Sequence, residues 1–152
     1  MKESQGKTVY LRDYRVPDFL IDETRLIVEL FETETLVTSR LKIRSNPAAN
    51  SPQAPLVLNG RAMELLEVKV AGKTLKGSDY VVDSDHLTIA DVPGNFLFEC
   101  RTRIKPQENT SLEGLYKSRV MFCTQCEAEG FRKITYYLDR PDVLSKIGRA
   151  HV

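Results

Sequence analysis

The sequence predicts an all-β domain with saddle-like or sandwich antiparallel sheets. Its apolar residues gather in short runs, and Gly, Asp, Ser or Pro residues bound each run. Several runs alternate apolar and polar side chains, as a strand with one buried face does. No segment carries several turns of the 3.6-residue periodicity of an amphipathic helix, and short strands between turn signals are typical of all-β sandwiches.

The elements follow in order along the chain. Residues 24–44 predict two strands joined by a turn, and the proline-rich segment 45–55 predicts a surface loop. Two hairpins are expected next, the first turning at Gly72 and Lys73 and the second at Ser84 and Asp85. Further apolar runs lie at 56–58, 65–72, 79–83, 86–92 and 95–104. Residues 140–147 could hold one helical turn, capped by Asp139.

Composition limits the classes of partner. A chain of 152 residues suits one domain. Its 22 basic and 21 acidic residues give a net charge of +1 with no basic block, so we expect no nucleic-acid partner. The polar amino terminus has no signal-like or membrane-spanning run, so we expect a cytoplasmic protein with no membrane partner. Three cysteines, an odd number, fit reduced thiols.

Cys123 and Cys126 form a Cys-x-x-Cys pair, for which three roles are considered: a redox pair, zinc ligands or packed apolar side chains. A redox pair needs the start of a helix in an α/β fold, which this pattern does not predict. Structural zinc would need two more ligands, and Cys100, His86 and His151 show no paired spacing, so we expect no metal site. Packing as small apolar side chains fits best. No HExxH, phosphate loop or GxSxG motif occurs either, so we expect no catalytic residue in this chain.

Between and after these cysteines, Gln125, Glu127 and Glu129 alternate. In an extended segment the three side chains would share one face, which is usually a solvated one. Aromatic residues flank this row, however, and Gly130 permits a tight turn that would place the carboxylates at a rim. A carboxylate beside an amide carbonyl offers suitable acceptors for a primary ammonium group.

The stretch NTSLEGLYKSRVMFCTQCEAEGFRKITYYLDRPDVLS (109–145) resembles the amino-terminal domain of the M1 zinc metallo-aminopeptidases, as in bacterial aminopeptidase N. YLRDYRVPDFLIDE (10–23) fits the same domain, and the resemblance extends over residues 9–146. It implies a β-saddle domain that packs against a thermolysin-like catalytic domain of the same chain, in enzymes that remove amino-terminal residues from peptides. It also implies that Gln125 and Glu127 reach the active site, where the glutamate binds the free α-amine of the peptide substrate.

The departures from the family pattern matter too. The GxMEN and HExxH motifs, the further zinc-binding glutamate and the family's tyrosine would lie beyond residue 152. We therefore expect zinc only in a longer parent protein, and an inactive domain that is incomplete at its C-terminal end. Residues 1–8 are expected to be flexible and 147–152 to be a foreign tail. Arg119 and Val120 stand where relatives often carry glycine.

Two further expectations concern the chain by itself. Without a catalytic domain against it, the domain should expose an apolar patch and an unpaired sheet edge. The alternative function is a free-standing β-sandwich binding module without catalysis.

Overall fold

The computed structural model describes residue 8 and residues 10–148. The residues expected to form a flexible amino terminus (1–8) and a foreign tail (147–152) lie largely outside this range, so both expectations stay predictions. No helix in the described part of the chain is long and apolar enough to cross a membrane.

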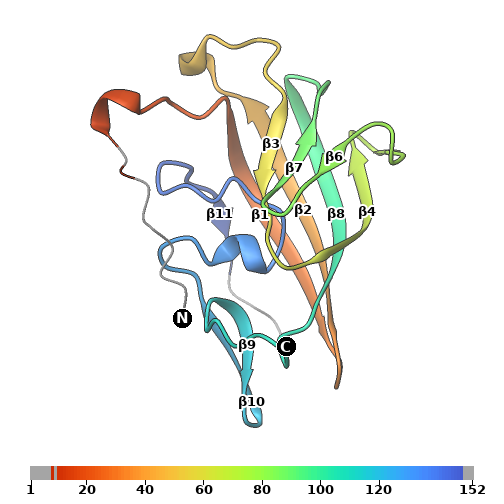
Figure 1. Ribbon diagram of the computed structural model, residues 1–152. Helices are drawn as coiled ribbons and strands as arrows, with labels where there is room; N and C mark the ends of the chain where they lie inside the picture. The colour runs from red at the N-terminus through yellow and green to blue at the C-terminus, as the bar shows by residue number, and fades with distance from the viewer. Residues whose placement is uncertain (1–7, 9, 149–152) are drawn as a thin grey trace.

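The regular structure of the described chain is nearly all β-strand, arranged in three sheets, so the all-β prediction is confirmed. The largest sheet has the strand order β11-β1-β2-β8-β4-β5, the second β3-β7-β6, and the third is the β9–β10 hairpin (Figure 1). The strands are β1 (Phe19–Leu30), β2 (Thr35–Ser45), β3 (Leu56–Asn59), β4 (Glu64–Val70), β5 (Lys73–Thr74), β6 (Val81–Val82), β7 (His86–Ile89), β8 (Asn95–Ile104), β9 (Gly114–Ser118), β10 (Met121–Gln125) and β11 (Lys146–Ile147). Three short 3-10 helices are η1 (Leu11–Asp13), η2 (Pro47–Ala49) and η3 (Phe131–Lys133).

The six-stranded sheet forms because its strands alternate between a buried and an exposed face. In β8, every second side chain from Phe96 to Ile104 is buried, and β2 repeats the pattern from Thr35 to Ile43. Neighbouring strands of this sheet run antiparallel except β11, which pairs parallel to β1. One face of the sheet is therefore apolar and has to be covered.

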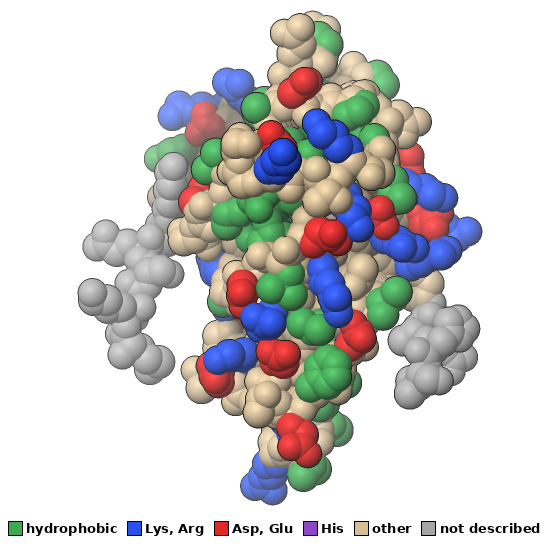
Figure 2. Space-filling model, turned by 90° about the vertical axis from the view of Figure 1, so that its right-hand side faces the viewer, with side chains coloured by type: hydrophobic (Ala, Val, Ile, Leu, Met, Phe, Trp, Pro, Cys, Tyr) green, Lys and Arg blue, Asp and Glu red, His purple; other side chains and the backbone are tan. Residues whose placement is uncertain are grey.

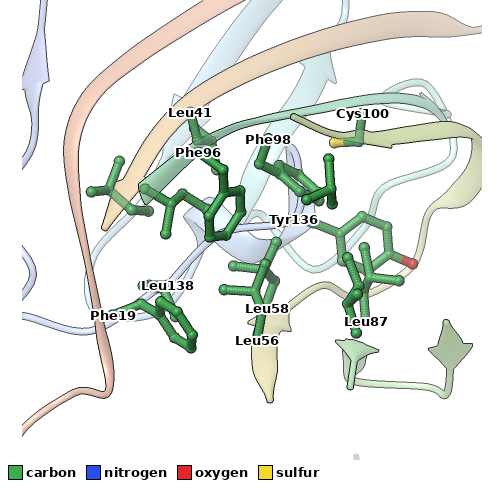
Figure 3. Packing of buried hydrophobic residues seen from close by; sticks show 14 of the residues in the cluster. Phe19, Leu41, Leu56, Leu58, Leu87, Phe96, Phe98, Cys100, Tyr136 and Leu138 are labelled. Carbon is green, nitrogen blue, oxygen red and sulfur yellow. The ribbon is translucent and has the colours of Figure 1, made fainter. Parts of the chain in front are cut away.

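The main core lies between this apolar face and the smaller β3-β7-β6 sheet, and residues 134–143 complete it (Figure 3). Phe98, Leu58 and Leu87 are fully buried there. The Tyr136 ring lies directly on the backbone of Gly60, where a Cβ would stand 2.2 Å from ring carbon Cε1. Segment 136–143, which follows the TQCEAEG stretch in the chain, is thus anchored in the core.

The outer face of the main sheet carries cross-strand ion pairs. They include Lys42 with Glu23 at 2.6 Å, Arg40 with Glu99 at 2.7 Å, Arg44 with Asp22 at 2.9 Å and Arg103 with Glu64 at 2.8 Å. Figure 2 shows acidic and basic side chains interspersed on the face that it presents. Opposite charges across antiparallel strands stabilise the sheet weakly and keep this face solvated.

The predicted turns are confirmed with one correction. β1 and β2 form the first hairpin, and β6 and β7 turn at Ser84 and Asp85 as expected. The β4–β5 turn lies one residue earlier than predicted, at Ala71 and Gly72, because Val70 pairs with Lys73. Both turn residues have positive φ, 50° and 78°, so Ala71 adopts a conformation that glycine usually supplies.

The predicted helical turn at 140–147 is wrong. Residues 140–145 form a turn and irregular chain, and Lys146 and Ile147 pair as β11 with Glu23 and Thr24 of β1. Asp139 does not cap a helix because its carboxylate binds Arg132 instead. Pairing with β1, more than a hundred residues earlier in the chain, thus sets the structure at Lys146 and Ile147, and the local helical pattern does not.

Candidate functional site

The β9–β10 hairpin carries Gln125 to the end of its second strand. Gln125 lies opposite Gly114, and Ser118 lies opposite Met121, which leaves Arg119 and Val120 as a two-residue turn. Arg119 has φ = 56°, whereas Val120 keeps an ordinary negative φ. The turn therefore forms without glycine, at the cost of placing a side chain in the left-handed region.

Arg119→Gly should raise the unfolding free energy by up to about 1 kcal/mol, because glycine adopts positive φ without strain. Val120→Gly is the matched control and should lower it, since Val120 has no such strain to relieve and glycine only adds unfolded-state entropy. Urea denaturation of the two variants checks the pair. Equal destabilisation by both substitutions would contradict the assigned turn.

After Gln125 the chain leaves the strand, so the predicted extended row is wrong. Residues 126–130 form a tight turn, closed by the Gly130 N–H donating to the Cys126 carbonyl oxygen at 2.8 Å. The Glu127–Ala128 peptide bond within it is cis. Gln125, Glu127 and Glu129 consequently do not share one face of a strand, although all three are exposed.

Two glycines hold this turn against the hairpin. A Cβ on Gly130 would lie 2.3 Å from the Gln125 carbonyl oxygen and 3.1 Å from the Gly114 nitrogen. Gly114 has φ = 73°, and a Cβ there would lie 2.7 Å from the Lys133 Cβ and 3.0 Å from the Gly130 oxygen. The backbones of the turn and of β9 therefore approach more closely than any side chain would permit.

Gly130→Ala should destabilise the chain by about 1–3 kcal/mol, because the added methyl group would overlap backbone atoms that cannot move aside cheaply. The φ of Gly130 is −84°, which alanine adopts freely, so the effect would come from space alone. Gly77→Ala is the control, since a Cβ at Gly77 meets nothing within 4 Å. Thermal unfolding distinguishes them, and equal melting temperatures would refute the close packing.

An ion pair of low exposure braces the far side of the turn. Arg132 donates from its backbone N–H and from Nε to Asp139 Oδ2, at 3.1 and 2.9 Å, and from its terminal nitrogen to the Asp139 carbonyl oxygen at 3.0 Å. The two side chains are only 12% and 11% exposed. The Asp139 N–H in turn donates to the Asn59 side-chain oxygen at 3.2 Å, which ties the pair to β3.

A second brace lies on the other side of the turn. The Lys133 ammonium contacts Glu113 Oε2 at 2.7 Å and donates to the Ser111 hydroxyl at 2.9 Å. The hydrogen bond from Lys133 holds the pKa of Glu113 below its ordinary value. Successive residues, Arg132 and Lys133, thus fix η3 to two different parts of the fold, and the turn that precedes η3 is held from both sides.

Of the two predicted site residues, Gln125 ends β10 and Glu127 lies on the braced turn that follows. Gln125 and Glu127 are exposed, and none of the hydrogen bonds or ion pairs among the described residues involves either side chain. Glu129, by contrast, reaches back to Arg132 at 3.3 Å. The end of β10 and the turn after it therefore expose one amide and one carboxylate to solvent. Sequence reasoning did not identify Arg132 and Asp139 as an ion pair, because they lie seven residues apart and no regular periodicity relates them.

Cys100 is buried in the main core, and Cys126 packs half-buried against the second apolar cluster. Burial raises the pKa of Cys100 to about 11, and burial followed by the charge of Asp139 raises the pKa of Cys126. All three are free thiols, and the chain after Cys126 turns into η3 rather than a helix of several turns. A redox cysteine needs a lowered thiol pKa, so this arrangement does not support the redox reading.

The described residues do not fit a zinc site. Within residue 8 and residues 10–148, no three His, Cys, Asp or Glu side chains come together as a metal would require. His86 lies at the surface beside Asp83, with 3.4 Å between Nδ1 and Oδ1, and His151 lies outside the described residues. No step of a reaction can be assigned to a metal held by these residues.

Comparison with known proteins gives the family. The model of the Peptidase M1 N-terminal domain matches residues 23–148. The chain belongs to the M1 peptidase family. Aminopeptidase N of Caulobacter vibrioides is 44% identical over 146 residues, which cover 96% of this chain and 17% of that protein. Aminopeptidase N of Escherichia coli is 40% identical over 142 residues, covering 93% and 16%.

Solved structures agree with this membership. A crystal structure of Legionella pneumophila aminopeptidase A in complex with aspartic acid superposes with a TM-score of 0.83 at 31% identity, over 89% of this chain and 16% of that one. An M1 zinc metallopeptidase from Deinococcus radiodurans, bound to a Tyr-Ser-Ala substrate, shares the fold at 13% identity with a TM-score of 0.68. This M1 domain spans about one-sixth of the length of the curated relatives that it matches.

Proposed function

We propose that this M1 amino-terminal domain recognises the free α-amine of a peptide substrate through Glu127 and Gln125. The observation that carries the proposal is that the Glu127 carboxylate on the braced turn and the Gln125 amide just before it are exposed, with no partner among the described residues. A primary ammonium group carries one positive charge and three donors, and these two side chains supply a negative charge and neutral oxygen acceptors.

The reaction itself would take place on a catalytic domain that continues the same chain, as in the aminopeptidases that this domain resembles. In that setting zinc, held by residues of the catalytic domain, would supply an activated water for peptide hydrolysis. Fixing the amine at Glu127 would place only the first peptide bond within reach of the metal, which explains how removal could be limited to the terminal residue. By itself, the domain would bind without catalysing.

A chimera tests the proposal. Residues 1–148 would replace the matching segment of the Caulobacter vibrioides aminopeptidase N, which is 44% identical. We expect the chimera to cleave peptides with a free amino terminus and to lose most of this activity on Glu127→Gln. A chimera that turns over normally while Glu127→Gln changes nothing would refute amine recognition by this residue.

A further inference from the structure

Asn59, the last residue of β3, is followed directly by Gly60. It is the only Asn–Gly pair in the sequence, since the other asparagines precede Pro, Ser, Phe or Thr. In an unfolded peptide, an asparagine before glycine loses its side-chain amide readily, because glycine has no Cβ that keeps its backbone nitrogen away from the asparagine side chain. The pair is therefore a chemically reactive point in the chain.

The reaction needs only water. The Gly60 backbone nitrogen attacks the Asn59 side-chain carbon Cγ, so that an N–Cγ bond forms while the Cγ–Nδ2 bond breaks. The proton of the Gly60 nitrogen leaves with Nδ2 as ammonia. Water then opens the resulting cyclic imide at either of its carbonyl groups, which gives aspartate or isoaspartate. In isoaspartate the main chain runs through the side-chain carbon.

Hydrogen bonds of the fold restrain both reacting groups. The Gly60 N–H donates to the Asp85 carbonyl oxygen at 2.8 Å. The Asn59 side-chain oxygen accepts from the Asp139 N–H at 3.2 Å. The backbone of Asn59 also exchanges hydrogen bonds with Tyr137, at 2.7 and 3.0 Å. The Gly60 nitrogen can turn toward the Asn59 side chain only when these bonds break.

Packing on Gly60 adds a second restraint. Gly60 is buried, and a Cβ on it would overlap the Tyr136 ring. Tyr136 is itself only 2% exposed and lies in the core with Leu58 and Leu87 (Figure 3). The missing side chain that makes the pair reactive in an unfolded chain is thus required here for close packing. The same packing leaves the Gly60 backbone no room to rotate.

We propose that Asn59 is a deamidation site that the fold shelters, so that it reacts only in chains where residues 136–139 have separated from the end of β3. Its rate then follows the population of this open form. Isoaspartate lengthens the backbone and shifts its register with Tyr137, and aspartate brings a second carboxylate close to Asp139. Neither product restores the native contacts, so a chain that opens and reacts cannot close as before.

Peptide mass spectrometry tests the proposal in the 152-residue chain. Samples are held at the same mildly alkaline pH and temperature, in buffer and in concentrated urea, and deamidation of Asn59 and Asn50 is followed in both. Asn50 is the internal control, because it is exposed, lies outside the strands and precedes serine. In urea Asn59 should react faster than Asn50. In buffer Asn59 should slow by about tenfold or more, and Asn50 much less.

Two variants identify the opening that exposes the site. Asp139→Ala removes the carboxylate that holds Arg132 and loosens residues 136–139, so it should speed the loss of Asn59 in buffer by about tenfold or more. Glu23→Ala removes an ion pair on the exposed face of the main sheet and should leave the rate unchanged. Asn59→Gln should abolish the signal in this peptide, which confirms its assignment.

The chimera provides a second sample, since its peptidase activity reports that the domain is folded. Loss of Asn59 as fast in buffer as in urea, in both the chain and the active chimera, overturns the proposal. So does an Asn59 that reacts no faster than Asn50 in urea, or an Asp139→Ala variant that keeps the parent rate. None of these outcomes depends on whether Glu127 binds an amine.

Discussion

Replacing Glu127 by Gln should lower kcat/KM of the chimera toward free-amine peptides by about thirty-fold to several thousand-fold. The substitution keeps the size of the side chain and removes its charge. Removing one member of a hydrogen-bonded, desolvated charge pair costs about 2–5 kcal/mol, and about 1.4 kcal/mol corresponds to each factor of ten in rate. Steady-state kinetics with a chromogenic free-amine substrate measures this directly.

Glu129→Gln is the matched control for this experiment. Glu129 lies two residues away on the same turn, is 68% exposed and already pairs with Arg132. Its replacement should change kcat/KM by less than about threefold, since a surface ion pair contributes little. A substrate with an acetylated amine should be poor for all three proteins. If Glu127→Gln stays within about twofold of the parent, the amine-anchor role is wrong.

Asp139→Ala should destabilise the domain by about 3 kcal/mol, because it leaves the Arg132 guanidinium at low exposure without its main partner. Two of the three hydrogen bonds from Arg132 go to the Asp139 carboxylate and would be lost, whereas the Asp139 backbone carbonyl oxygen at 3.0 Å and Glu129 at 3.3 Å would remain. In the chimera, the loosened turn should also reduce kcat/KM. Chemical denaturation of the domain measures the first effect, and kinetics at a temperature where the variant is folded measures the second.

Glu23→Ala is the comparison variant, because it removes an exposed ion pair, whereas Asp139→Ala removes one of low exposure. The Lys42–Glu23 pair is shorter than the Arg132–Asp139 pair, 2.6 against 2.9 Å, but it lies on the exposed face of the sheet. Its loss should therefore leave stability nearly unchanged. If the two substitutions had equal effects, distance alone would govern these pairs, and the bracing role of Asp139 would be refuted.

Local signals in the sequence predicted most strands and turns. The alternation in β2 and β8 and the turn at Ser84 and Asp85 depend on side-chain period and turn chemistry, which neighbouring residues supply. The resemblance also pointed to Gln125 and Glu127, which the structure places, both exposed, at the end of β10 and on the turn that follows it. Their role in recognition stays a prediction.

The shape of the site did require it. The extended row through Gln125 failed because Gly130 packs on the backbone at Gly114, a contact that no local pattern encodes. The helical turn after Asp139 failed because Arg132 takes the Asp139 carboxylate. In the same way, β11 pairs with Glu23 and Thr24 of β1, more than a hundred residues earlier in the chain. The sequence by itself determined most of the strands and turns. Only the tertiary structure decided how the turn after β10 is held and where the chain after Asp139 pairs, because long-range contacts outweigh local propensity where backbones meet.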